Sequence, residues 1–502
     1  MKSLSLKLDS SSKAKYIVIA DAIRQAIKQG QVAPAEALPS ARKLAEQLNT
    51  NRHTIMAAFA ELVAEGWVEA KQRSGYIVVA SLPIQSSQNI NKVETKQAQF
   101  KWQFVRKGII QNPIKATKFR YNFAGGQPDL RLFPFDEFRG YFSQSCQRPQ
   151  FDDLSYGDSK GLPDLINQVS TYLRRMRSIT EKEIMICNGS QEALYMVTQL
   201  LLQSGDKVAV EQLGYPPAWA AFRSSGAELI PINQDEKGII PKHLEYELKL
   251  NTIKLLYLTP LHQYPTTVTL DVERRMKIYQ LAVKYHVAIV EDDYDHEFHY
   301  KCQPIAPMAA DDPLGLVIYI STFSKLMFGS ARIGYVAANQ NLIQALAEYK
   351  TLMNHKNNVL IQQAVSRWMK EGGFECHLRR MTRTYQKRRD ITVNILKHYQ
   401  SLGLPIKFKN PDGGMAIWVD MGKSIVGLKE KLFKKQVYLQ TQLEFDLNHN
   451  NRKQEVSSFN FIRIGFASME ESELKQGIKI IFDTLYGDYL VESIQSVFNT
   501  EQ

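Results

Sequence analysis

A series of short strand-like segments, separated by helical patterns, fills most of the chain and leaves few folds open to it. "KVAVE", "LLYLTP", "VAIVEDDY" and "VIYIST" are four of these segments, and apolar residues dominate each of them. Strands that alternate with helices are typical of an α/β domain with a mostly parallel central sheet. We therefore predict such a domain over residues 118–502.

The N-terminal part of the chain follows a different pattern, three short helices and a hairpin. Residues 16–28 carry apolar side chains at helical spacing, a second helix begins at Ser40, and a third begins at Asn51 or the residue before it. Two strand-like runs around the "SG" at 74–75 indicate a hairpin. This order predicts a winged helix-turn-helix domain over residues 1–80. The side chains expected to face inward are Ile19, Ile23, Ala26, Ile27, Ile55, Ala58, Phe59 and Leu62.

Between these two segments, residues 81–117 are rich in Gln, Asn, Ser and Lys and have no sustained period. Such a composition is typical of a linker, in which the "FKWQF" cluster is the part suited to dock on a neighbouring domain. A chain of 502 residues is also longer than one hydrophobic core usually serves, which agrees with separate domains.

Charge and hydropathy narrow the choice of partners. The formal net charge is +12 and the pI is near 9.2, so a polyanionic partner is compatible with the surface. No apolar run is long enough for a membrane span and the N-terminus lacks the apolar core of a secretory signal, so we expect a cytoplasmic protein with no membrane partner. Four scattered cysteines without C-x-x-C spacing argue against a disulfide framework and a zinc site.

The third helix carries candidate DNA-binding residues at its N-terminal end. Arg52, His53 and Thr54 stand where a recognition helix meets base edges and phosphates. Arg42 starts the preceding helix, and Lys71 and Arg73 flank the predicted wing. A solvated charged face on a small helical bundle explains this pattern equally well, so the residues alone leave both interpretations open.

The stretch from residue 16 to residue 78 is similar to the DNA-binding domain of GntR-type regulators. "LPSARKLA", "NRHTI" and "LVAEG" stand in that family's order, and a glycine follows in the wing. Asn51 replaces the family's usual serine and Gln72 a frequent wing glycine, which leaves the operator sequence open. The resemblance implies binding to double-stranded operator DNA through Ser40, Arg42, Arg52, Thr54, Arg73 and Gly75.

Two of the predicted strands end in groups of polar residues. "VAIVEDDYDHEF" ends its strand with Asp292 and Asp293, and "VIYISTFSK" ends in Lys325. Ligands bind at the carboxyl edge of an open parallel sheet, so these residues mark a candidate site. The acidic cluster with His296 and His299 could suggest a metal, but no partner cluster of ligands is visible elsewhere in the sequence.

An aldehyde cofactor accounts for the same residues better. A buried lysine near positive charge can form a Schiff base, a carboxylate can keep a pyridine nitrogen protonated, and a tyrosine can tune the ring hydroxyl. "MICNGSQEALYMVTQLL" adds a strand, a Gly-Ser-Gln turn and a helix N-terminus that could cradle a phosphate. All four parts of such a site are present in the chain.

The segment from about residue 121 to residue 485 resembles the fold-type I aminotransferases, which bind pyridoxal 5′-phosphate (PLP). Closely similar strings in that family match "FAGGQPDLRLFPFDEFR", "YGDSKGLPDLI", "TPLHQYPTT" and "FIRIGFA". Behind a GntR-type domain, the whole chain resembles a MocR-type transcriptional regulator. The resemblance implies a fold-type I aminotransferase-like domain with a smaller C-terminal α+β subdomain.

Carried over residue by residue, the resemblance assigns the cofactor contacts. It implies that Lys325 is the Schiff-base lysine, that Asp292 pairs with the pyridine nitrogen, and that Tyr294 lies near the ring hydroxyl. Tyr215 becomes the ring that stacks on the cofactor, although a tyrosine there would by itself suggest a core aromatic. The phosphate-side residues are Ser190, Gln191, Thr322, Ser324 and Arg332.

The resemblance also assigns two contacts beyond the cofactor ring. Arg463 matches the arginine that grips the α-carboxylate of an amino acid, and Tyr156 matches a residue that reaches the phosphate of the partner subunit in a homodimer. One departure concerns the family string N-P-T-G, which reads Y-P-T-T at 264–267, so the usual asparagine contact is missing and the role of Gln263 stays open. Pro216 follows Tyr215 and offers no second arginine for a distal carboxylate.

Three functions compete at this stage. The one we expect is a PLP-dependent regulator that senses an amine, an amino acid or the cofactor itself, rather than a physiological enzyme. The second is an active aminotransferase with an attached DNA-binding domain, motivated by the intact Lys325, Asp292 and Arg463. The third is a DNA-binding module whose large domain only dimerises, and the retained polar cofactor partners argue against it.

Overall fold

The chain forms two compact units, Met1–Phe104 and Val105–Gln502. The structure is a computed structural model that describes residues 6, 14–71, 75–80, 119–147, 151–155, 157–300, 305–448 and 459–499. The predicted linker at 81–117 lies outside these residues. Within them, no helix is both long and apolar enough to cross a membrane.

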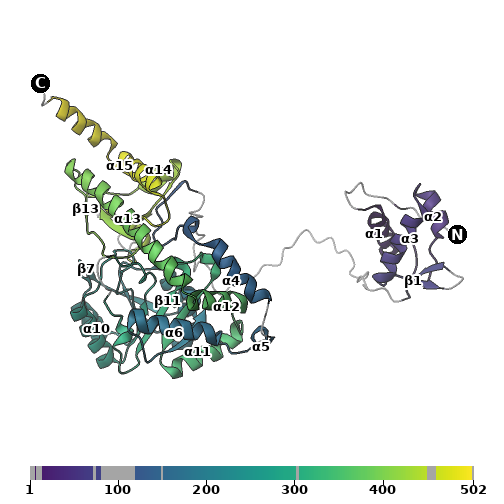
Figure 1. The fold of residues 1–502 in the computed structure, drawn as a ribbon, viewed down its shortest axis with the longest axis horizontal. Helices are drawn as coiled ribbons and strands as arrows, with labels where there is room; N and C mark the ends of the chain where they lie inside the picture. Colours follow the sequence, from purple (N-terminus) through teal and green to yellow (C-terminus); the bar gives the residue numbers. More distant parts are fainter. Residues whose placement is uncertain are drawn as a thin grey trace. The chain divides into compact units, whose positions relative to one another are not determined.

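Three helices and a two-stranded antiparallel sheet make up the first unit (Figure 1). Ser40 caps the second helix, because its Oγ accepts a hydrogen bond from the Lys43 amide at 3.3 Å. Asn51 caps the third helix through an Oδ1 that accepts from the His53 amide at 3.0 Å, which decides between the two predicted caps. The elements are α1 (Lys15–Lys28), α2 (Ala41–Gln47), α3 (Arg52–Ala64), β1 (Val68–Lys71) and β2 (Gly75–Val78).

The predicted inward faces of α1 and α3 are confirmed, and all eight side chains expected to face inward are buried. The two strands pair with Val68 opposite Val78 and Lys71 opposite Gly75, so the predicted hairpin is also confirmed. Its turn, residues 72–74, lies outside the described part of the chain. The winged helix-turn-helix prediction therefore holds for the elements that the structure describes.

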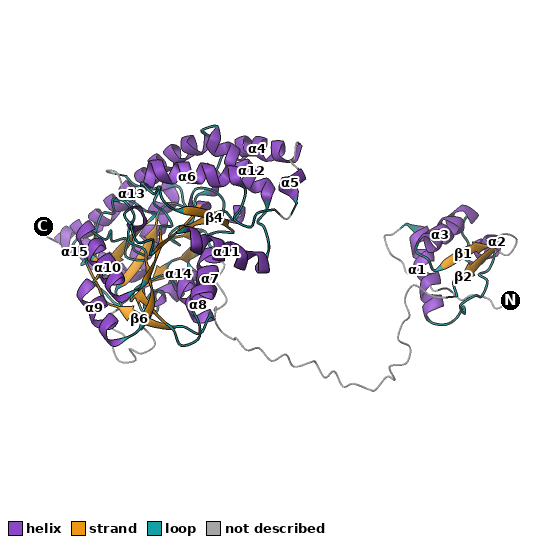
Figure 2. Ribbon diagram, turned by 90° about the horizontal axis from the view of Figure 1, so that it is seen from below, coloured by secondary structure: helices purple, strands orange, loops and turns teal. Residues whose placement is uncertain are grey.

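The second unit is built on a seven-stranded sheet with helices on both faces (Figure 2). β12 runs antiparallel to its two neighbours, and the other six strands are parallel to one another. The prediction of a mostly parallel sheet is confirmed. In spatial order the strands are β4 (Glu183–Cys187), β12 (Gly334–Ala338), β11 (Val317–Thr322), β10 (Ala288–Asp292), β9 (Ile253–Leu258), β5 (Lys207–Glu211) and β6 (Glu228–Ile232).

Successive side chains of each central strand enter two different cores. In β10, Ile289 packs in one buried cluster and Val290 in the other, because neighbouring side chains point to opposite faces of a strand. A sheet buried on both faces reads as a nearly continuous apolar run, which explains the strand pattern of the sequence. The helices of this part are α4 (Phe135–Gln147), α5 (Phe151–Leu154), α6 (Pro163–Arg177), α7 (Ser190–Leu201), α8 (Pro216–Ser224), α9 (Pro241–Leu250), α10 (Val272–Tyr285), α11 (Gln340–Met353) and α12 (Val359–Lys370).

A smaller subdomain follows, with an antiparallel four-stranded sheet and three helices. The sheet has the order β13 (Lys407–Phe408), β14 (Ala416–Asp420), β17 (Phe461–Gly465) and β16 (Gln440–Thr441). Its helices are α13 (Gly373–Ser401), α14 (Leu428–Lys434) and α15 (Glu471–Asn499). Two further strand pairs are β15 (Val437–Tyr438) with β3 (Tyr121–Asn122) and β7 (Gln234–Asp235) with β8 (Gly238–Ile239).

Candidate functional site

A cavity of about 270 Å³ lies at the carboxyl ends of β9, β10 and β11. Six of the predicted cofactor-site residues line it, although they come from four separate segments of the sequence. These residues are Ser190, Tyr215, Asp292, Tyr294, Thr322 and Lys325. The remaining lining residues are Ala124, Gly125, Gly126, Gln127, Tyr257, Thr259, Tyr264, Tyr438 and Gln440, none of which was predicted as a site residue.

Lys325 follows β11 in a short 3-10 helix and is half-buried. Its Nζ lies beside the backbone of Gly126, where an added Cβ would be 3.2 Å away. Burial lowers the pKa of Lys325, and the carboxylates of Asp295 and Asp292 only partly oppose this effect. A lowered pKa raises the fraction of neutral amine, the form that attacks an aldehyde.

Asp292 is the last residue of β10 and is 3% exposed. Its Oδ2 accepts a hydrogen bond from the Tyr257 hydroxyl at 2.8 Å, whereas Oδ1 has no partner among the described residues. Burial raises the pKa of Asp292 to about 7, and the nearby carboxylate of Asp293 adds to the rise. A cationic N–H in the cavity would satisfy Oδ1 and lower this pKa again, so the site fits a protonated pyridine.

The predicted phosphate side is assembled around the N-terminus of α7. Gly189 precedes this helix with a φ of 85°, and an added Cβ would lie 2.9 Å from Nη2 of Arg332. The same Nη2 donates to the Asn188 carbonyl. Thr322 pairs with Gly334 across β11 and β12, and an added Cβ at Gly334 would lie 3.0 Å from the Ser190 amide. Free helix N–H groups, hydroxyls and a guanidinium therefore meet here, as an anion requires.

Two hydroxyl groups complete this cradle. Thr322 Oγ1 accepts a hydrogen bond from the Ser324 amide at 3.1 Å and lies 2.9 Å from Ser324 Oγ. Gln191 takes a different position, because its Nε2 donates to the Pro217 carbonyl at 2.9 Å and its side chain does not line the cavity. The side chain of Gln191 thus ties α7 to the start of α8.

Three tyrosines, Tyr215, Tyr264 and Tyr294, line the part of the cavity that is predicted to hold the cofactor ring. The Tyr215 and Tyr264 rings are 5.1 Å apart in an edge-to-face arrangement, and the Tyr294 hydroxyl donates to the His262 carbonyl at 2.9 Å. Gln263 does not reach the cavity, since its Nε2 donates to the Leu213 carbonyl at 2.7 Å within the loop region. The side chain of Gln263 therefore does not replace the asparagine that contacts the cofactor in the resembled family.

Arg463 lies on β17 and has no exposed surface. Its guanidinium carbon is 4.4 Å from the centroid of the Tyr264 ring, and an added Cβ at Gly125 would lie 1.4 Å from Nη1. Both Nε and Nη1 lack a hydrogen-bond partner among the described residues. Buried N–H groups without acceptors are costly, so this guanidinium fits an anionic ligand that supplies the acceptors.

A buried polar network lies directly next to Asp292. Asp293 Oδ2 accepts hydrogen bonds from Arg177 Nη2 at 2.6 Å and from the Tyr319 hydroxyl at 2.7 Å. Burial raises the pKa of Asp293, but the charges of Arg177 and His296 and these hydrogen bonds outweigh it and hold the pKa at about 2. The carboxylate of Asp293 thus belongs to a structural ion pair, and no group of three potential metal ligands converges in the described parts of the chain.

This ion pair predicts how stability responds to acid. Because the folded pKa of Asp293 is about 2 and the unfolded value is 3.8, its charge stabilises the fold fully above pH 4 and less as the pH falls toward 2. The pH-dependent part is roughly 2 kcal/mol. Denaturant unfolding of Asp293→Asn should show a deficit at pH 7 that narrows near pH 3. The exposed Asp136→Asn is the control, and a deficit independent of pH would contradict the prediction.

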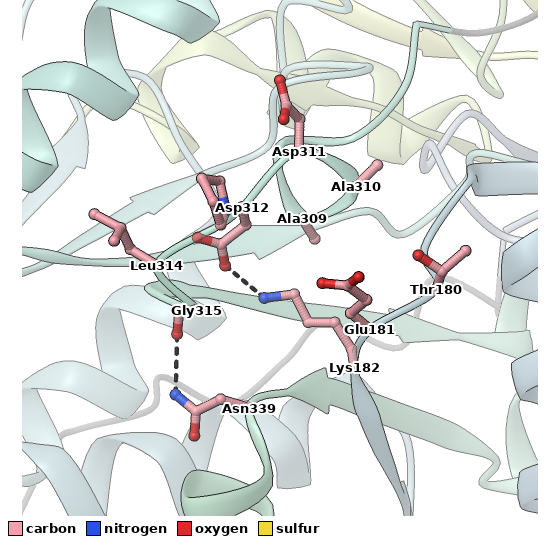
Figure 3. Close-up of a pocket in the computed structure, with 11 residues that line it drawn as sticks. Thr180, Glu181, Lys182, Ala309, Ala310, Asp311, Asp312, Leu314, Gly315 and Asn339 are labelled. Atoms are coloured by element: carbon pink, nitrogen blue, oxygen red, sulfur yellow. Dashed lines mark hydrogen bonds and ion pairs between the residues drawn. The ribbon is translucent and has the colours of Figure 1, made fainter.

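A larger cavity of about 430 Å³ lies at the amino ends of β4 and β11, on the opposite edge of the sheet (Figure 3). Three of its polar side chains, those of Lys182, Asp312 and Asn339, already bond to one another or to the backbone. Lys182 Nζ pairs with Asp312, and Asn339 Nδ2 donates to the Gly315 carbonyl at 3.0 Å. No buried lining atom lacks a partner in the described chain, so this cavity offers no orphaned group to a ligand.

The predicted DNA-binding residues of the first unit lie mainly on its surface. Arg52 is exposed at the start of α3, Thr54 beside it is half-buried, and Arg42 is exposed on α2 with a long 3.5 Å pair to Glu46. Gly75 opens β2 with a φ of 80°, a conformation that favours glycine. Ser40 is exposed as the cap of α2, and Arg73, like Tyr156 in the larger unit, lies outside the described residues.

Two family models match the chain. Aminotransferase class I and II matches residues 149–481, and the family of bacterial regulatory proteins named gntR matches residues 15–78. The second match covers α1, α2, α3 and the hairpin, and the first covers most of the larger unit.

Similar proteins include regulators and enzymes. The probable rhizopine catabolism regulatory protein MocR of Rhizobium meliloti is 29% identical over 397 residues, 79% of each chain. The HTH-type transcriptional regulator TauR of Rhodobacter capsulatus is 27% identical over 471 residues, 91% of this chain and 93% of TauR. The crystal structure of Pyrococcus horikoshii kynurenine aminotransferase superposes with a TM-score of 0.67 at 29% identity and covers 74% of this chain and 91% of that enzyme. The predicted fold-type I aminotransferase fold is confirmed by this similarity.

Proposed function

The chain belongs to the aminotransferase class I and II family and carries a gntR-family segment in front of it, and from this premise we propose that it is a PLP-dependent transcriptional regulator of the MocR type. The observation that carries the proposal is the presence, in one chain, of a cavity whose polar side chains suit PLP and of a helix, α3, with exposed cations at its start. The regulators MocR and TauR, which match most of this chain, support the same function.

The orphaned atoms of the cavity support PLP as the cofactor. Asp292 Oδ1 would accept from the pyridine nitrogen, Lys325 Nζ would bind the aldehyde carbon covalently, and Ser190 would hold the phosphate. When bound, PLP supplies an aldehyde that reacts with amines and a ring that withdraws electrons. Tyr215 would cover one face of the ring, and Arg332 would add positive charge beside the phosphate.

The ligand that the regulator senses is, in our proposal, an amine or amino acid, or PLP itself. Arg463 would bind an α-carboxylate, since its buried Nε and Nη1 have no described acceptor and a planar guanidinium suits a carboxylate. An active aminotransferase is the second candidate, because the kynurenine aminotransferase shares the fold and because Lys325, Asp292 and Arg463 are all present. The Tyr264-to-Thr267 loop, where the N-P-T-G string is changed, favours the sensor over the enzyme.

We further propose that the protein acts as a homodimer and binds its operator DNA in the cytoplasm. Phe135 and Phe142 expose apolar surface on α4, which supports a protein interface there. Tyr156 remains our candidate for the contact with the phosphate of the partner subunit. Two DNA-binding units in one dimer would favour paired operator half-sites, since linked binding raises effective concentration.

A coupling experiment tests the proposed function. We expect an amino acid that binds at Lys325 to change operator affinity about tenfold to a hundredfold, which needs roughly 1.4 to 2.8 kcal/mol of coupling. Operator DNA should change the affinity for that amino acid by the same factor. Amino acids and amines are titrated into the full-length, PLP-loaded protein with and without a selected operator duplex, and absorbance and anisotropy are followed.

The same mixtures are assayed for keto-acid release. Rapid multiple turnover together with unchanged DNA affinity would favour the aminotransferase and contradict the sensor. A change in DNA affinity without turnover is the result that we expect.

A further inference from the structure

The outer face of α3 carries several apolar side chains that are exposed on the surface of the first unit. Met56 is 38% exposed, and Ala57, Ala60 and Ala64 are also exposed on this face. The opposite face, with Ile55 and Phe59, fills the core of the unit. Met56 is thus partly packed on the unit, but its exposed part and the exposed alanines are available for a partner.

Exposed cationic side chains lie at the N-terminal end of this apolar strip, whereas Glu61 is exposed toward its C-terminal end. Arg52 and His53 are exposed one helical turn before Met56, and Arg42 and Lys43 are exposed on α2. Arg52 makes no hydrogen bond or ion pair with any other residue that the structure describes. A strip of small apolar groups beside cations is complementary to the major groove of DNA, where phosphates flank base edges.

We propose that α3 reads thymine, with the side chains of Met56 and Ala57 packed against C5-methyl groups in the major groove of the operator. This inference rests on the proposed function, because it assumes that α3 is the recognition helix. The first turns of such a helix meet the base edges, and Met56 and Ala57 lie in its second turn. Thymine differs from every other base in the major groove by its methyl group, and apolar side chains recognise it.

The two side chains have suitable and different shapes. Ala57 is small and lets the helix backbone approach the bases closely. Met56 is flexible and adapts its thioether to a methyl group at a range of positions. Arg52 would hold the helix through a phosphate or a guanine, so the cations would set affinity while Met56 and Ala57 would set the preference for thymine.

The test removes single methyl groups from the DNA. The full-length protein selects its operator from a random duplex library, and each thymine of the selected half-site is then replaced by deoxyuridine, which lacks only the C5-methyl. At one or two positions we expect binding to weaken about fourfold, the effect of losing one buried methyl group. Binding is measured by fluorescence anisotropy at one salt concentration.

Variants assign the effect to residues. Met56→Ser should bind the thymine and deoxyuridine duplexes equally at its position, and Ala57→Gly should do so at another. Met276→Ala, which changes an exposed methionine on α10 of the larger unit, should retain the full dependence on the methyl group. Arg52→Ala should weaken binding to both duplexes and leave their ratio unchanged.

Two outcomes would overturn the inference and leave the proposed function intact. One is a selected operator in which no thymine-to-deoxyuridine exchange changes affinity. The other is a methyl dependence that Met56→Ser and Ala57→Gly both retain. A Met56→Ser protein that binds DNA normally but loses self-association would assign the strip to a protein interface instead. If no sequence is enriched at all, the proposed function itself fails.

Discussion

Lys325→Ala should lose the near-visible absorption band that the PLP-loaded wild-type protein shows. The band requires the covalent bond between Lys325 Nζ and the aldehyde carbon of the cofactor, and alanine has no amine to form it. Asp292 and the phosphate-side residues remain in the variant, so we expect PLP to bind without covalent attachment. Absorbance spectra of the purified proteins with equal PLP added measure the difference.

Borohydride reduction followed by peptide mass measurement makes the assignment specific. Wild-type protein should carry the cofactor mass on the Lys325 peptide, and Lys325→Ala should carry none. Lys207→Ala is the matched control, because Lys207 is also half-buried. It begins β5, at the edge of the sheet opposite the cavity, and donates to Asn251 Oδ1 at 2.7 Å. Equal covalent incorporation into Lys325→Ala would refute the assignment.

Arg463→Met should weaken the binding of α-amino acids by roughly thirtyfold or more. Removing one member of a buried, hydrogen-bonded charge pair costs about 2 to 5 kcal/mol. Without a ligand, Arg463 is a fully buried cation whose Nε and Nη1 have no described acceptor. The apolar methionine should therefore leave the thermal stability of the ligand-free protein unchanged or higher.

A ligand pair provides the control for Arg463→Met. An amine that equals the amino acid without its carboxylate should bind the variant and the wild-type protein equally well. Titrations followed by the change in cofactor absorbance give both affinities. An equal loss for the amine and the amino acid would mean that Arg463 supports the site without contacting a carboxylate.

The sequence predicted those residues that are marked by a nearby strand end or helix start. Asp292 could be found because it ends a recognisable strand and Lys325 because it closely follows one, and parallel strands bring their carboxyl ends to one edge. Ser40 and Asn51 were predictable as caps because a short polar side chain before a helix satisfies free amides.

The other contacts depend on strand register and on distant segments. Tyr257 on β9 pairs with Val290 on β10, and this register brings its hydroxyl to Asp292. Nothing in the "LLYLTP" run marks that hydroxyl as functional. Gln191 was expected at the phosphate, but its side chain turns to the Pro217 carbonyl, since the rotamer of a first-turn helical residue is set by its neighbours. The sequence could not predict that lining residues 124–127 would meet Tyr438 and Gln440, because only the fold brings these distant segments together.

The short pairing of β3 with β15 has a mechanical consequence. The Tyr121 amide donates to the Gln436 carbonyl at 3.0 Å and the Phe123 amide to the Tyr438 carbonyl at 2.9 Å. β3 is the first described strand of the larger unit, and Tyr438 at the end of β15 lines the cavity. The first described strand of the larger unit is thus hydrogen-bonded to a strand whose last residue lines the cavity. A displacement of that part of the cavity wall would therefore move β3 with it, because the two strands are hydrogen-bonded to each other.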